Sequence, residues 1–118
     1  MTEFTLPWPP KELNPNARIH WARKANITKA YKHACWALTL ESGVQVPDSK
    51  RISLWLDFYP PDKRCRDDDN IVASFKAGRD GIAKALGIDD KRFIVHPFVK
   101  DSIGGMVKVR LTAQPFCE

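Results

Sequence analysis

Three consecutive aspartates, Asp67, Asp68 and Asp69, follow a basic stretch and precede an apolar-periodic run over 71–86. Adjacent carboxylates repel one another and lower local stability unless a cation lies among them. Carboxylate oxygens are the ligands that Mg²⁺ prefers, and the ion usually keeps waters that a phosphate substrate can displace. The aspartate run therefore suggests a metal site that acts on a phosphodiester.

Basic side chains come just before the aspartates and also in an earlier polar segment, 11–26, which holds amides and Trp21. Cations interleaved with an aromatic residue suit phosphate contacts and base stacking. An ordinary polar loop held by a buried Trp21 explains the earlier segment equally well. The cations that we expect to bind nucleic-acid backbone are Arg18, Arg23, Lys24, Lys63, Arg64 and Arg66.

The spacing of the carboxylates indicates which of them could share a metal. Asp67 and Asp69 are two residues apart, so in extended chain their side chains share a face and Asp68 points away. The first N–H groups of the following helix favour ionised carboxylates there. Asp89 and Asp90 lie just past the other end of that helix, and a third carboxylate reaches the cluster only if that end passes near it.

Other interpretations of the aspartates are open. Asp69 alone would suit a helix N-cap, which leaves Asp67 and Asp68 unexplained. The run could also be a solvated loop. An EF-hand loop is excluded, because Ile71 stands at its fifth position and Val72 replaces the required glycine. The chain has no G-x-S-x-G setting and no Walker-type loop, and its three histidines have no ligand spacing.

Composition sets the broad class. The 118 residues suit one domain, 1–118, and the formal net charge of +5 favours a polyanionic partner. Cys35, Cys65 and Cys117 form no C-x-x-C pair, which argues against a disulfide framework or a zinc ribbon and favours a reducing cytoplasm. The first residues do not resemble a signal peptide, and no apolar stretch is long enough for a membrane span.

Periodicity predicts an α+β fold with the order β-α-β-α-β-β, in which one small mixed four-stranded sheet packs on two helices. A first helix should begin at a Thr28 cap, run to about Ser42 and bury Tyr31, Ala34, Cys35 and Leu38. The second should bury Ile71, Phe75, Gly78, Ile82 and Leu86. We expect strands over 3–6, 51–59, 93–100 and 106–112.

Two of these strands carry further information. Residues 51–59 alternate, with Ile52, Leu54, Leu56 and Phe58 on one face and Ser53, Trp55, Asp57 and Tyr59 on the other. The partly aromatic second face is suited to being covered by a partner. Pro97 places the strand over 93–100 at a sheet edge or a bulge, because proline has no N–H for the ladder.

Taken in order, several segments resemble the RusA family of Holliday-junction resolvases, which is common in phages and prophages. Residues 4–10, FTLPWPP, look like its opening strand and proline turn. Residues 66–70, RDDDN, look like its R-D-x-D-N signature, and residues 87–90, GIDD, resemble its acidic turn. The resemblance covers nearly the whole chain in order and length.

The resemblance implies a homodimeric, Mg²⁺-dependent endonuclease that nicks four-way DNA junctions symmetrically in recombination and repair. Asp67, Asp69 and Asp90 would hold one or two Mg²⁺, or Mn²⁺ in its place, with no small-molecule cofactor. The family's lysine falls near Ala73 here, so Lys76 would take its role from about 10 Å along the helix axis, with Arg79 as a fallback. A nuclease on other branched or duplex DNA, and a non-catalytic DNA-binding protein, are the alternative functions.

Overall fold

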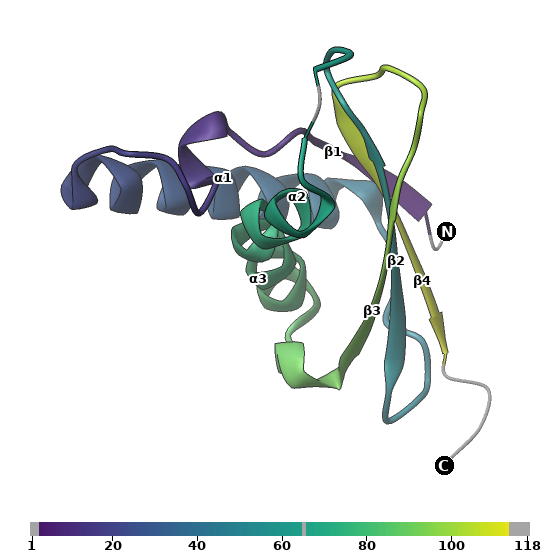
Figure 1. Ribbon diagram of the computed structural model, residues 1–118. Coiled ribbons are helices and arrows are strands. Elements are labelled where there is room, and N and C mark those ends of the chain that lie inside the picture. The colour runs from purple at the N-terminus through teal and green to yellow at the C-terminus, as the bar shows by residue number, and fades with distance from the viewer. Residues whose placement is uncertain (1–2, 65, 114–118) are drawn as a thin grey trace.

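The computed structural model describes residues 3–64 and 66–113, so Cys65 and the predicted tail over 114–118 with Cys117 lie outside it. Four strands and three α-helices follow one another along the chain (Figure 1). Short 3₁₀ helices occur at Lys11–Leu13 and Asp90–Arg92. The elements are β1 (Glu3–Pro7), α1 (Trp21–Ser42), β2 (Ile52–Tyr59), α2 (Asp68–Ser74), α3 (Lys76–Leu86), β3 (Phe93–Val99) and β4 (Met106–Ala113).

The strands form one sheet in the order β1-β4-β2-β3. Strand β2 pairs in parallel with β3 and antiparallel with β4, and β1 pairs antiparallel with β4. The predicted α+β fold with a mixed four-stranded sheet is therefore confirmed. Strand β3 is an edge strand, as Pro97 indicated, and an edge position tolerates the missing ladder N–H.

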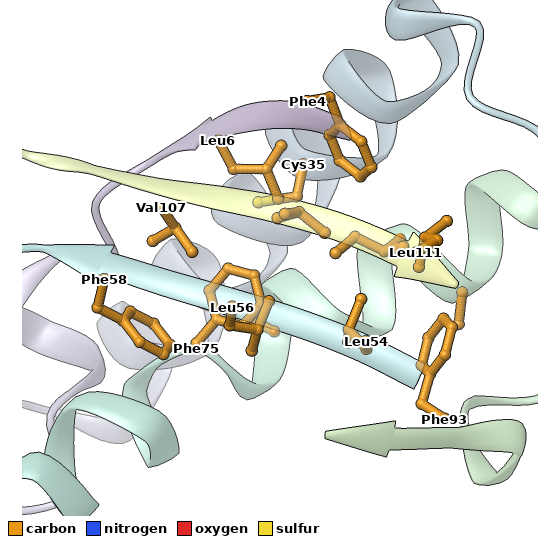
Figure 2. Close-up of a cluster of buried hydrophobic side chains, with 14 of the residues drawn as sticks. Phe4, Leu6, Cys35, Leu54, Leu56, Phe58, Phe75, Phe93, Val107 and Leu111 are labelled. Atoms are coloured by element: carbon orange, nitrogen blue, oxygen red, sulfur yellow. The ribbon is translucent and has the colours of Figure 1, made fainter. Parts of the chain in front are cut away.

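All three helices lie on one face of the sheet (Figure 1). The alternation predicted for β2 is confirmed, because Ile52, Leu54, Leu56 and Phe58 are all at most 1% exposed. Figure 2 shows Leu54, Leu56 and Phe58 in one core with side chains of β1, β4 and the helices. Within the described residues, no helix is long and apolar enough to cross a membrane.

Helix α1 begins at Trp21, seven residues before the predicted Thr28 cap. The His20 side chain caps it by accepting the Ala22 N–H, whereas the Thr28 hydroxyl donates to the Lys24 carbonyl inside the helix. The alternative of a polar loop held by a buried Trp21 is wrong, since this side chain is 77% exposed. Leu38 is also exposed, and the buried stripe of α1 is instead Tyr31, Cys35 and Thr39.

The second predicted helix is broken at Phe75 into α2 and α3. The Phe75 N–H donates to the Val72 carbonyl, a tighter i to i−3 bond that ends α2. The Phe75 side chain at the break is 1% exposed and lies over Gly78. A Cβ at Gly78 would come within 2.6 Å of the Phe75 ring. The estimate of the Lys76 position along one continuous helix therefore does not apply.

Four aromatic rings join the elements beneath α2. Phe75 makes edge contacts with Phe58 of β2 and Tyr31 of α1, at centroid distances of 5.6 and 6.4 Å. Trp8, just after β1, meets Phe58 edge-on at 6.1 Å. The Tyr31 hydroxyl donates to the Pro7 carbonyl at 2.7 Å, and burial raises the pKa of this phenol, so it stays a donor. Burial also raises the pKa of the neighbouring Cys35 thiol to about 12.

Helices α1 and α3 are in close contact at Gly81. A Cβ on Gly81 would lie 2.5 Å from the Lys32 carbonyl oxygen and 3.1 Å from Cys35 Cβ. Backbone at that distance cannot move aside as a flexible side chain can, so glycine is required for this crossing.

We expect Gly81→Ala to lower the free energy of unfolding by about 1–3 kcal/mol, because the added methyl forces α1 and α3 apart. Helix propensity alone predicts the opposite sign, since alanine in a helix interior is favoured over glycine by about 1 kcal/mol. Urea unfolding followed by circular dichroism distinguishes the two. A variant more stable than the native protein would contradict the close crossing.

Candidate metal and nucleic-acid site

Asp67 is the N-cap residue of α2, in extended conformation, and Asp68 and Asp69 occupy the first helical turn. The Asp69 N–H donates to Asp67 Oδ1 at 2.9 Å, so one carboxylate oxygen of Asp67 is engaged by the backbone of the other predicted ligand. The interpretation of Asp69 as the cap is wrong, because Asp67 has that role. An aspartate at the N-cap satisfies an orphan helix N–H, which explains why this residue type suits the position.

The three carboxylates are exposed at the helix start. Within the described part of the chain, no cation pairs with them and the second oxygen of Asp67 accepts no hydrogen bond. Mg²⁺ is usually held by one or two carboxylates together with waters and substrate phosphates. The donor set at Asp67 and Asp69 therefore fits a hard divalent ion that relies on its substrate to complete the coordination.

Asp62 organises the basic loop that leads into α2, a role that the sequence analysis missed. Its carboxylate accepts the Arg64 N–H at 2.9 Å and lies 2.8 Å from Arg66 Nη2. The Arg64 N–H, followed by the two arginine side chains, holds the pKa of Asp62 below its usual range. Arg66 also lies against the Trp8 ring, at 5.8 Å from the centroid. The loop conformation therefore holds Arg66 in place beside α2, while Arg64 is largely exposed.

A pocket of about 430 Å³ opens beside Asp67. Its walls come from the start of α2, the loop after β2 and the segment after β1, which lie far apart in the sequence. Two of the predicted cations, Arg64 and Arg66, line it, and so does Lys11, which sequence reasoning missed. The lining residues are Trp8, Pro9, Lys11, Asn14, Pro61, Arg64, Arg66, Asp67, Asn70, Ile71 and Ser74.

A second hollow of about 370 Å³ adjoins the first along α2, because Ser74 lines both. Lys24 and Lys76 contribute cations to it, and Asp80 contributes an acid. The Lys76 ammonium lies 3.9 Å from Asp80 and its side chain is 67% exposed. The two hollows share Ser74 and together carry five basic side chains, and we call the pair of them the trough.

The other predicted cations lie outside both hollows. Arg23 is paired with Glu12 at 3.4 Å near the start of α1, and Arg18 is exposed just before that helix. Lys63 is exposed in the loop before α2, and no ion pair holds it within the described residues. These three side chains could reach only nucleic acid that extends past the trough.

Asp90 is the predicted site residue that the structure places apart. It lies in the 3₁₀ helix just before β3, and its carboxylate is 3.6 Å from Arg79 Nη2. The neighbouring Asp89 accepts the Lys91 N–H, which lowers the pKa of Asp89. Across residues 3–64 and 66–113, no group of three His, Cys, Asp or Glu side chains is arranged to hold a metal. Asp90 as a third ligand stays a prediction.

Comparison with known proteins identifies a relative but no described function. The chain matches no family model. It is 44% identical over 117 residues to a protein from Xylella fastidiosa, strain Temecula1, that is named only as an uncharacterised protein. The alignment covers 95% of this chain and 76% of the relative. This chain therefore belongs to the same family as the Xylella protein.

Proposed function

We propose that the protein is a Mg²⁺-dependent endonuclease that cleaves branched DNA, with the four-way junction as its preferred substrate. It would act in the cytoplasm in recombination or repair, as a RusA-type resolvase. The observation that supports this proposal best is the trough along α2. The exposed Asp67 lines a pocket together with Lys11, Arg64 and Arg66, so an oxygen ligand for a metal and cations for a phosphate adjoin each other.

Each group in the trough has a role in this proposal. Asp67 and Asp69 hold the divalent ion, which would polarise a phosphate oxygen and lower the pKa of a water when bound. Arg64, Arg66 and Lys11 position the flanking phosphates without reading the sequence. Lys76 stabilises charge on the phosphate at the far end of α2. A two-fold homodimer would present two such sites to the two opposed strands of a junction.

The alternative functions make different predictions for a labelled substrate. A junction resolvase cuts a four-way junction in preference to linear duplex made of the same arms. A nuclease for other branched or duplex DNA cuts flaps or the duplex equally well. A non-catalytic binding protein binds with or without Mg²⁺ and gives no product. Cleavage of the junction, a flap and the duplex, each with and without Mg²⁺, separates the three.

We expect Asp67→Asn and Asp69→Asn each to lower the Mg²⁺-dependent cleavage rate at least about a hundredfold, because a metal ligand loses its charge. Junction binding should be unchanged or tighter, since fewer negative charges face the phosphates. Asparagine is as good an N-cap as aspartate, so Asp67→Asn should keep its melting temperature. Gel assays of cleavage and fluorescence anisotropy of binding measure the two effects.

Two further variants control for fold and for charge alone. Asp67→Ala should lose about 1 kcal/mol of stability as well as activity, because the N-cap is removed. Asp48→Asn changes an exposed aspartate in the connector before β2 and should leave cleavage as it is. Full cleavage by Asp69→Asn in Mg²⁺ would refute the site.

Arg64→Ala tests the phosphate contacts of the pocket. The Arg64 side chain is 81% exposed, so its removal should leave the fold intact. We expect junction binding to weaken for every DNA sequence, and the slope of log K against log salt to fall in magnitude by about 1. Lys91→Ala, on the exposed turn before β3, is the matched control. An unchanged slope for Arg64→Ala would place the bound backbone elsewhere.

A further inference from the structure

Strand β3 has a free edge. It is the last strand on its side of the sheet, and within residues 3–64 and 66–113 it pairs with β2 alone (Figure 1). The Lys100 N–H, just past β3, donates to the Phe58 carbonyl of β2 at 2.9 Å. Backbone polar groups alternate between the two edges of a strand, so the even-numbered residues of β3 bond toward β2. The backbone groups of Val95 and Pro97 therefore face the free edge.

Val95 is the position at which another strand can pair with this edge. Pro97 has no N–H to offer, and its outward position leaves the pairing with β2 intact. The Phe93 N–H already donates to the Asp90 carbonyl. Val95 keeps both its N–H and its carbonyl for an extended segment that lies along β3, as in recognition by strand addition.

A pocket of about 220 Å³ adjoins Val95 on the helix-covered face of the sheet. Side chains that lie opposite each other in neighbouring strands point to the same face. The residue of an added strand that lies opposite Val95 would therefore point its side chain toward this pocket. The walls are apolar except for two cations, and no acid lines them; the lining residues are Leu56, Val72, Ala73, Phe75, Lys76, Arg79 and Val95.

Arg79 is the cation that points to an acidic ligand. Its side chain is only 31% exposed, and it donates no hydrogen bond within the described residues. The Nε atom is buried without a partner, and the ion pair with Asp90 spans 3.6 Å, which is beyond hydrogen-bond distance. A buried guanidinium N–H without an acceptor is unfavourable, and the guanidinium fork matches a carboxylate. Arg79 therefore favours a carboxylate beside the apolar pocket.

These three features together select one kind of ligand. A nucleic-acid strand would match the cations, but it has no apolar side chain for the pocket and no regular backbone amides for the edge of β3. A small apolar acid would match the pocket and Arg79, but it would leave the Val95 backbone groups unused. An extended peptide with an apolar residue and an acidic residue two positions away matches the edge, the pocket and the charge.

We propose that the free edge of β3 and its pocket, which we call the β3 site, bind an extended segment of a partner protein. The segment adds a strand at Val95, places a leucine-sized side chain in the pocket and presents a carboxylate to Arg79. This inference does not rest on the proposed function, because neither Asp67 nor Asp69 lines the pocket.

The probe is a fluorescein-labelled peptide of sequence Thr-Glu-Thr-Leu-Thr-Glu-Thr, which has an acid two positions from the leucine in both chain directions. We expect saturable binding to the free protein by fluorescence anisotropy, without DNA or metal. Replacing the leucine by serine, or both glutamates by glutamine, should weaken binding about tenfold or more. Asp67→Asn and Asp69→Asn should bind this peptide as the native chain does, so the test is separate from that of the nuclease.

Two pairs of variants test the backbone and the charge. Val95→Pro removes the outward N–H and should weaken binding about fivefold or more relative to Val95→Ala, which shortens the side chain and keeps the N–H. Arg79→Met should weaken binding about tenfold or more, because a charged hydrogen bond is lost. Arg51→Met, which changes an exposed arginine just before β2, is its control and should bind normally.

Several results would overturn the proposal. One is the absence of peptide binding up to about 1 mM, the weak limit for specific recognition. Another is binding that Val95→Pro weakens no more than Val95→Ala, and that octanoate displaces, which would assign the pocket to a small apolar acid. A third is a native dimer that Val95→Pro dissociates in sedimentation velocity, which would assign the edge to a second copy. Circular dichroism checks the fold, and Arg79→Met supplies the test if Val95→Pro does not fold.

Discussion

The packing of the Phe75 ring beneath α2 is the contact on which the arrangement of the candidate site depends. Phe75 meets Phe58 at the end of β2 and Tyr31 of α1, and Tyr31 in turn bonds to the Pro7 carbonyl at the end of β1. Three segments far apart in the sequence are thereby fixed to one point of the core. The segment after β1, the loop after β2 and the start of α2 are the walls of the pocket beside Asp67. Loss of this contact would separate Lys11 from Asp67, whereas Arg64 and Arg66 stay near Asp67 because they are its neighbours in the sequence.

The same packing explains why the sheet has two unlike faces. Three helices must bury their apolar sides, and α1 and α3 can cross closely only because Gly81 has no side chain. All three helices cover the same face of the sheet (Figure 1). On the other face, the aromatic rings contact one another and neighbouring cations. These contacts reduce the exposed area of the rings although no helix lies over them. A sheet face whose side chains contact one another but which no helix covers is suited to meeting a partner.

Much of this fold could be predicted from the sequence, because strand alternation is a direct consequence of burial on one face. The start of α1 could not, since its first turns bury no residue fully and so carry no periodic signal. The break at Phe75 was hidden because this residue also fits the stripe of an unbroken helix. At the site, the aspartates and arginines were visible as a local cluster. Lys11, Asn14 and Asp62 were not, because their roles depend on contacts that only the folded chain makes.

The electrostatics of the trough determine which ligand it can stabilise. The aspartates at the start of α2 have no cation partner within the described residues, and the N-terminal end of the helix offsets only part of their repulsion. Lys11 and Arg64 line the same pocket as Asp67, and both are exposed. A cation alone would satisfy the acids and repel the bases, and an anion alone would do the reverse. A divalent ion bound to a phosphate carries a positive charge for the acids and a negative charge for the bases. The complex of ion and phosphate should therefore bind in the pocket more tightly than either component alone. The proposed function therefore predicts that metal and DNA bind cooperatively, with the phosphate supplying the ligands that a third carboxylate would otherwise provide.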